Sequence, residues 1–194
     1  MDRHFIINIG RQFGSGGKQV ASALGKMLGV PVYDSELIGR AAQESGISSS
    51  AFEPADEERK SLRLGLFHGS FGDVELFNIQ SETIRNIAAS GSAVIVGRCS
   101  DYVLRDMEGT LDVFITAPMD KRIERVSQRT GLDSDKAKSL ILKKDRARAS
   151  YYDCFTFGNW GVAGNYDLCL DSSILGIDGS ASFIIDFARK AGIL

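Results

Sequence analysis

The sequence is poor in metal ligands, with only three cysteines and two histidines among its 194 residues. Cys99, Cys154 and Cys169 are far apart and form no C-x-x-C pair, and only His4 and His68 could join them. A zinc site is therefore not expected. We interpret the cysteines as small core residues of a protein in a reducing compartment.

Long apolar runs and an excess of one charge are also missing. No stretch approaches ~18 consecutive apolar residues, and the N-terminal MDRHFIINIG has too few of them for a signal peptide. A net charge of −2 provides no general attraction to nucleic acid or to a membrane surface. We therefore expect a cytoplasmic protein with no nucleic-acid or membrane partner, folded as one domain over residues 1–194; its oligomeric state is not indicated.

Short apolar runs alternate with longer segments of helical periodicity. The runs that predict strands are 5–9, 30–34, 93–97, 111–117 and 166–172. The segments that predict helices are 17–28, 35–45, 99–107, 120–130, the beginning of 135–154, and 179–192. This alternation predicts a three-layer α/β domain, with a parallel sheet of about five strands and helices on both faces.

Two segments interrupt the alternation. Residues 47–75 are polar or broken by glycine, and residues 129–162 combine basic charge with the aromatic-rich stretch YYDCFTFGNW. Because both lie between predicted strands, we interpret them as insertions on one sheet and expect them to be the mobile parts. We expect the aromatic side chains of the second segment to pack against the core rather than to stack on a base.

The stretch GRQFGSGGKQ follows the first predicted strand and leads into the first predicted helix. Ligands of open parallel sheets bind beyond the carboxyl ends of the strands, where a helix N-terminus also attracts anions. Gly10, Gly14, Gly16 and Gly17 allow the backbone to approach a ligand closely. The stretch is therefore predicted to bind phosphate.

Its spacing departs from the phosphate-loop pattern G-x-x-x-x-G-K-[ST]. Gln12 stands where the first glycine belongs, and Gln19 stands where Ser or Thr belongs. Two alignments remain open. Either residues 14–16 are the inner glycine turn and Lys18 falls one place late, or Lys18 is the phosphate lysine and the first glycine has been lost.

Further motifs follow in order along the chain. They are DSELIGRA at 34–41, VIVGRCS at 94–100, LDVFITAPMDKRIERV at 111–126, DRAR at 145–148 and YDLCLDSSIL at 166–175. Together with GRQFGSGG they resemble the nucleoside monophosphate kinases, and most closely the cytidylate kinase-like family, over nearly the whole chain. The chain departs from that pattern at Glu36, Leu37 and Gly39, and at Cys99, where the family has aspartate.

The resemblance implies a P-loop NTPase-like fold, with 47–75 as the insertion on the nucleoside monophosphate side and 129–162 as the lid. It implies ATP and Mg²⁺ as cofactors and nucleotides as small-molecule partners. The residues expected to bind the cofactor are Gly10, Gly14, Ser15, Gly16, Gly17, Lys18 and Gln19. Those expected to bind the acceptor are Asp34, Ser35, Arg40, Arg98, Asp145 and Arg148, with Asp145 on the sugar. Lys18, Arg98 and Arg148 are the expected catalytic residues.

Phosphoryl transfer needs in-line positioning and positive charge, which arginine supplies through a planar fork that stays charged. Ser15 is the candidate metal-side hydroxyl because Gln19 cannot replace one, and Asp34 either orients Mg²⁺ through water or caps the following helix. Arg122, Arg125 and Arg129 share a helical face leading into the lid, and we interpret them mainly as surface cations.

The expected activity is ATP-dependent phosphorylation of a nucleoside monophosphate, with CMP as the first choice. The alternatives are a nucleotide-binding or sensing protein without turnover, and a kinase for a non-nucleotide acceptor. The atypical spacing of the phosphate loop, and Cys99 at the position where the family has aspartate, leave both alternatives open.

Overall fold

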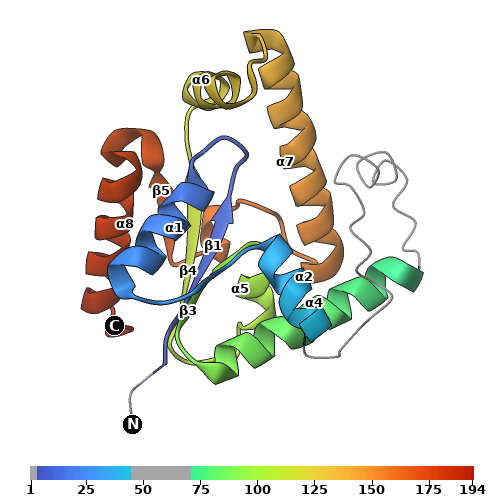
Figure 1. The fold of residues 1–194 in the computed structure, drawn as a ribbon, viewed down its shortest axis with the longest axis vertical. Coiled ribbons are helices and arrows are strands. Elements are labelled where there is room, and N and C mark those ends of the chain that lie inside the picture. The colour runs from blue at the N-terminus through green and yellow to red at the C-terminus, as the bar shows by residue number, and fades with distance from the viewer. Residues whose placement is uncertain (1–3, 45–70) are drawn as a thin grey trace.

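The computed structural model describes residues 4–44 and 71–194. Within these segments five strands form one parallel sheet in the order β2-β3-β1-β4-β5 (Figure 1). The strands are β1 (Ile6–Arg11), β2 (Val32–Tyr33), β3 (Ala93–Val96), β4 (Thr110–Thr116) and β5 (Leu168–Asp171). The central β1 lies between β3 and β4, so the loop that follows it opens at the middle of the carboxyl edge.

Helices cover both faces of the sheet, as predicted. They are α1 (Gly17–Leu28), α2 (Ser35–Glu44), α4 (Phe71–Ser90), α5 (Ser100–Val103), α6 (Met119–Thr130), α7 (Ser134–Thr156) and α8 (Ser172–Lys190), with a 3-10 turn at Ala163–Asn165. α1 and α8 pack on one face, and α2, α4 and α5 lie on the other (Figure 1). None of the helices in the described part of the chain has the length and apolarity needed to cross a bilayer.

The central strand is buried because both of its faces are covered. Ile7 and Ile9 pack with Val20 and Leu24 of α1, whereas Ile6 belongs to the core on the opposite face. All five side chains have no exposed surface. Burial of each aliphatic side chain contributes roughly 1.5–3 kcal/mol to the stability of the fold. This packing holds the end of β1 and the start of α1 in place, and so fixes the position of the loop between them.

Several boundaries differ from those predicted. The helix expected at 99–107 is only Ser100–Val103, because the backbone leaves the helical region at Leu104. The last helix begins at Ser172 instead of 179, because the Asp171 carboxylate caps it by accepting the N–H of Ser173 at 2.8 Å. This helix is kinked at Gly176, where φ is 68° and the backbone is not helical.

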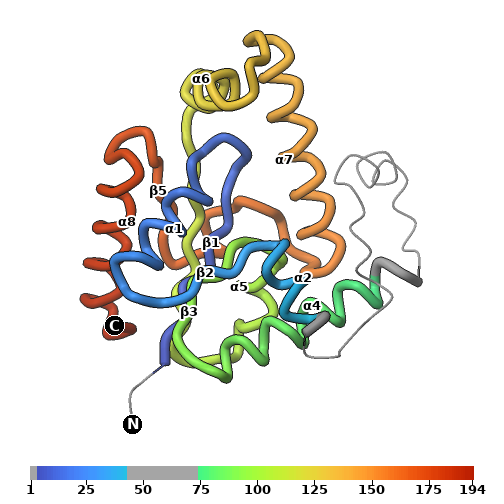
Figure 2. Tube along the Cα trace, in the orientation of Figure 1, coloured from blue at the N-terminus to red at the C-terminus, as the bar shows by residue number. Residues whose placement is uncertain are grey.

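The two expected insertions have different outcomes. Residues 47–70 lie outside the described residues, whereas 71–75 are not an excursion but the first turn of α4. In the second segment, α7 continues as one helix from Ser134 to Thr156, beyond the helical beginning predicted there. Figure 2 shows the loop between β1 and α1 next to α7, so this helix borders the site.

Candidate active site

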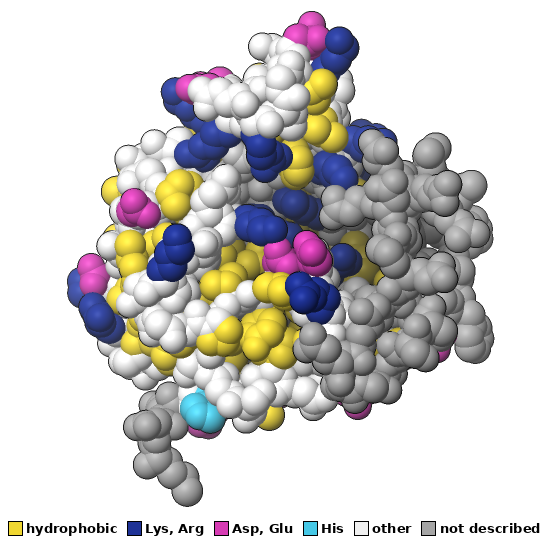
Figure 3. Space-filling model, viewed as in Figure 1, with side chains coloured by type: hydrophobic (Ala, Val, Ile, Leu, Met, Phe, Trp, Pro, Cys, Tyr) yellow, Lys and Arg dark blue, Asp and Glu magenta, His cyan; other side chains and the backbone are white. Residues whose placement is uncertain are grey.

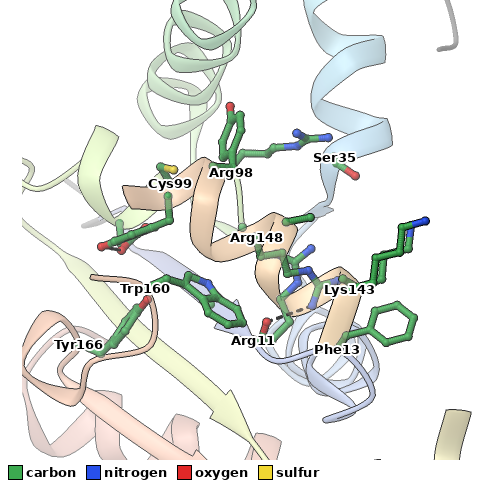
Figure 4. Close-up of a pocket in the computed structure, with 16 residues that line it drawn as sticks. Arg11, Phe13, Ser35, Arg98, Cys99, Lys143, Arg148, Trp160 and Tyr166 are labelled. Carbon is green, nitrogen blue, oxygen red and sulfur yellow. Dashed lines mark hydrogen bonds between the residues drawn. The ribbon is translucent and has the colours of Figure 1, made fainter. Parts of the chain in front are cut away.

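A cavity of about 280 Å³ opens at the carboxyl ends of β1 and β3, against α7 (Figure 4). Its lining residues are Gly10, Arg11, Phe13, Ser35, Gly97, Arg98, Cys99, Asp101, Lys143, Lys144, Ala147, Arg148, Tyr151, Tyr152, Trp160 and Tyr166. Basic side chains gather around the hollow below α6 in Figure 3. One wall of the cavity is therefore cationic and another is aromatic.

The glycine loop ends at an open helix N-terminus. Gly14 and Gly16 have φ values of 80° and 83°, which only glycine adopts at little cost. Gly16 is the N-cap of α1, yet no side chain caps this helix and its first turn has no acidic residue. Because the first N–H groups of a helix lack intrahelical partners, this terminus presents donors and a positive dipole to an anion.

The carbonyl side of the same loop is held by α6 and α8. Arg122 Nε donates to the Phe13 carbonyl at 2.8 Å, and Arg125 Nη1 donates to the Ser15 carbonyl at 2.8 Å. The Ser172 hydroxyl also donates to the Ser15 carbonyl. The interpretation of Arg122 and Arg125 as surface cations is therefore wrong, because both side chains turn inward and position the loop. Arg122 is only 4% exposed.

Asp145 completes this arrangement from α7. Its carboxylate accepts the Phe13 N–H at 2.7 Å and forms an ion pair with Arg122. The family resemblance implies a contact between Asp145 and the sugar of the acceptor. In this conformation Asp145 instead joins α7 to the loop, and it is not among the residues that line the cavity.

In the structure Gly17 is the first residue of α1 and Lys18 the second. Which of the two alignments holds stays a prediction. The Lys18 side chain is 73% exposed, and its ammonium lies 2.6 Å from Asp34 Oδ2. Gln19 is exposed on the next position of the helix.

The two predicted metal ligands do not fit direct coordination. Asp34 Oδ1 accepts the N–H groups of Glu36 and Leu37 at 3.1 and 3.2 Å, while Oδ2 pairs with Lys18. Burial opposes ionisation of Asp34, but Lys18 and these two amides outweigh it, and the pKa lies below its usual value. The Ser15 hydroxyl is fully buried and donates to the Gln12 carbonyl at 2.9 Å. Among the described residues, no three His, Cys, Asp or Glu side chains form a metal-binding group.

Arginines from three elements meet at the cavity. Arg11 comes from the end of β1, Arg98 from the turn after β3, and Arg148 from α7 (Figure 4). Arg148 Nη1 donates to the Arg11 carbonyl at 3.1 Å, and the Arg98 guanidinium lies 5.7 Å from the centroid of the Tyr151 ring. The fold thus brings Arg98 and Arg148 together, as the motifs predict, whereas Arg40 is exposed on α2 and does not line the cavity.

The turn after β3 is strained. Gly97, Arg98 and Cys99 have successive φ values of 72°, 61° and 56°, and a non-glycine residue in this left-handed region costs about 1–2 kcal/mol. The turn directs Arg98 into the cavity and buries the Cys99 side chain. Burial and the nearby Asp101 carboxylate raise the pKa of the Cys99 thiol, so the thiol is neutral.

The aromatic wall contains a carboxylate that the sequence motifs do not reveal. Asp101 Oδ2 accepts the Tyr152 hydroxyl at 2.7 Å, beside Trp160 and Tyr166. Burial raises the pKa of Asp101, although the Tyr152 hydroxyl partly offsets this effect. A clue lies nearby in the sequence, since Asp101 is two positions after Cys99, the residue that replaces an expected aspartate.

Part of the aromatic segment packs as expected. Phe155 stacks on Phe77 of α4 with ring centroids 4.3 Å apart, and Trp160 contacts Phe114 of β4 edge to face at 5.4 Å. Tyr151 and Tyr152, however, also line the cavity. The segment therefore both packs the lid against the sheet and shapes the candidate site.

The fold and the loop together define an α/β protein of the P-loop NTPase-like class. The chain matches the model of the cytidylate kinase-like family over residues 6–174, and it belongs to that family. A cytidylate kinase of Methanobrevibacter smithii is 30% identical over 148 residues, which cover 76% of this chain and 77% of that protein.

Solved structures share the fold. An uncharacterised protein from Eubacterium ventriosum superposes with a TM-score of 0.75 at 28% identity, covering 95% of this chain and 98% of that one. A shikimate kinase from Bacteroides thetaiotaomicron superposes with a TM-score of 0.56 at 14% identity, covering 95% and 98% of the two chains. The second likeness concerns the fold alone.

Proposed function

We propose that this protein transfers a phosphoryl group from ATP to a nucleoside monophosphate, with CMP as the first candidate acceptor. The observation that carries the proposal is the loop between β1 and α1, which ends at an uncapped helix terminus and, together with the last residue of β1, contributes Arg11 and Phe13 to a cationic cavity. Its carbonyls are held by Arg122, Arg125 and Ser172. Such a loop is preorganised to receive phosphates without rearranging.

The candidate site has two parts, the helix terminus and the cavity, which suits a reaction between two substrates. The donor phosphates would occupy the helix terminus, and the acceptor would occupy the adjoining cavity between Ser35, Arg98 and the aromatic wall. Arg98 and Arg148, which both line the cavity, would neutralise charge on the transferred group and on the acceptor phosphate. The relative from Methanobrevibacter smithii, named cytidylate kinase, makes CMP the acceptor to test first.

A coupled assay tests the proposal directly. The full chain is supplied with ATP and Mg²⁺, because the family resemblance implies both, and with CMP, UMP, AMP or GMP in turn. We expect turnover with at least one pyrimidine monophosphate and the highest kcat/KM for CMP. Absence of turnover with every monophosphate would contradict the proposal.

A nucleotide-binding protein without turnover is the second candidate. The position of Lys18 favours it, because a phosphate loop that directs its lysine to Asp34 lacks one of the usual cations. ATP binding measured by calorimetry in the same preparation distinguishes the two. Tight binding without transfer to any acceptor would select the second candidate.

A further inference from the structure

The side chain of Arg11 follows a path that two glycines make possible. Arg11 ends β1, and a Cβ added to Gly17 would lie 2.6 Å from Arg11 Cβ and 3.0 Å from Arg11 Cγ. A Cβ added to Gly97 would lie 2.0 Å from Arg11 Nη1 and 3.0 Å from Cζ. The stem therefore lies against the first residue of α1, and the guanidinium lies against the turn after β3.

This path brings a permanent positive charge to the ligand side of the loop. Arg11 lines the cavity together with Arg98 and Arg148, as Figure 4 shows. The Lys18 ammonium pairs with Asp34, and the Lys18 side chain is 73% exposed. The cation at the junction of β1, α1 and the turn after β3 is thus on the strand and not on the helix.

The backbone of Arg11 is also fixed. Its Cα is paired with Ile115 of β4, and its carbonyl accepts Arg148 Nη1 at 3.1 Å. A guanidinium that starts from a paired strand residue loses little freedom when it binds. Its planar fork suits two phosphate oxygens, which a lysine ammonium contacts only as a point charge.

We propose that Arg11 binds the donor's phosphates in place of the loop lysine, and that Gly17 and Gly97 are required for its side chain to reach them. The inference rests on the proposed function for the identity of the donor. It assigns to one strand residue the charge that the pattern G-x-x-x-x-G-K places on the helix. Lys18 then has a different task, the ion pair with Asp34 that joins α1 to the start of α2.

The test compares Arg11→Met, Arg11→Lys and Lys18→Met in the full chain, with Arg189→Met on the exposed surface of α8 as the matched control. Binding of ATP and of inorganic tripolyphosphate is measured by calorimetry, and circular dichroism verifies folding. We expect Arg11→Met to weaken both ligands by at least about tenfold and Arg11→Lys to restore part of the affinity. Lys18→Met should lose less affinity than Arg11→Met, and Arg189→Met should lose none.

Gly17→Ala provides a second route that leaves Arg11 in place. Gly17 has no positive φ, and alanine favours a helix, so the cost of the substitution lies in the contact of the added Cβ with Arg11 Cβ and Cγ, which shifts both the end of β1 and the arginine stem. We expect it to weaken tripolyphosphate binding, and we expect Arg11→Met to add little further loss in the double variant. Fully additive losses would contradict the shared path.

The outcomes separate the inference from the proposed function. A wild-type chain that binds tripolyphosphate through Arg11 but phosphorylates no acceptor would remove the kinase proposal and leave the inference standing. Active protein in which Arg11→Met keeps wild-type affinity, or in which Lys18→Met loses more, would overturn the inference alone. Wild-type protein that binds neither ATP nor tripolyphosphate would overturn both.

Discussion

Arg98 and Arg148 reach the cavity from different directions, one from the strained turn after β3 and the other from α7. In a kinase, two such arginines would flank the transferred phosphoryl group and stabilise charge that develops only during transfer. Their contribution should therefore appear in kcat more than in the binding of ATP. This separates them from Arg11, whose proposed contact is already made in the ground state.

We expect Arg98→Ala and Arg148→Ala each to lower kcat by roughly 10³-fold, with a much smaller change in ATP affinity. Steady-state kinetics and calorimetry on the same preparations measure the two quantities, and Arg105→Ala on the exposed part of the chain after α5 is the control. Equal losses in kcat and in affinity would assign both arginines to simple binding.

The sequence motifs predict some of the residues of the candidate site and fail to predict others. Ser35, Arg98 and Arg148 line the cavity as expected, because each follows a strand or lies on the lid helix. Lys18 and Asp145 are expected to meet ligands, but the structure pairs each with another part of the protein. Spacing along the chain does not encode which partner a charged side chain meets across the fold.

The loop between β1 and α1 is an element whose anion site can be seen directly. We expect sulfate or phosphate to occupy the loop of residues 10–18 in crystals grown from either salt, because the α1 terminus has no side-chain cap. Crystallography at several concentrations of the anion measures the occupancy. A loop whose N–H groups bond internally in every crystal would contradict the expectation.

α6 and α7 form an element pair with a small core of its own. Val126 packs with Ala137 and Ile141 in a cluster separate from the two cores that flank the sheet. Arg122, Arg125 and Asp145 tie this pair to the glycine loop, so closure on a ligand would have to carry the loop along or break those hydrogen bonds. That the lid of residues 129–162 closes on nucleotides stays a prediction.

We expect hydrogen exchange in α6 and α7 to slow when a bisubstrate analogue joining adenosine and cytidine through phosphates is added. Exchange in β1, β3 and β4 should change little, and these strands serve as the internal control. Equal protection of α7 with and without the analogue would remove the idea of closure. The other predicted mobile segment lies mostly outside the described residues.

The helix α4 shows why one element is hard to predict from sequence. Three of its buried side chains are polar, namely Gln80, Ser81 and Thr83. The Ser81 and Thr83 hydroxyls donate to carbonyls one turn earlier, those of Phe77 and Ile79, at 2.8 Å. These internal hydrogen bonds allow polar residues on the buried face, so the apolar stripe that normally predicts a helix is interrupted.

At the scale of the whole molecule, alternating strands and helices predict the parallel three-layer fold. The order of the strands does not follow from the alternation, since β2 pairs with β3 and not with β1. That order depends on packing across long stretches of chain, such as Ile9 beside Val96 and Val113. Apolar runs in the sequence predict which segments form strands, but they do not predict which strands pair with each other.

The stability of the whole molecule should depend on pH through Asp112. This β4 carboxylate accepts Asn8 Nδ2 at 2.8 Å, and burial raises its pKa from 3.8 to about 6. The folded state therefore binds more protons than the unfolded state between those values, and stability falls as the pH rises through that window. Above it the cost is at most about 3 kcal/mol, and less once solvent screening is included.

We expect Asp112→Asn to raise the melting temperature at pH 7.5 and to leave it nearly unchanged at pH 4. The asparagine oxygen can still accept from Asn8, so the main change is the loss of charge. Thermal unfolding across pH 4–8 measures the effect, and Asp106→Asn on the exposed surface is the control. A variant equally stabilised at both pH values would show that charge burial is not the cause.

The clamps on the glycine loop also impose an order of events during synthesis. The loop is complete once Gly17 has been made, but the groups that hold its backbone are Arg122, Arg125, Asp145 and Ser172. The last of them lies 157 residues beyond the carbonyl that it binds. A nascent chain that stops before Ser172 can contain the whole loop and α1 and still lack a fixed anion site, so ligand binding in the cell should begin only after Ser172 has been made.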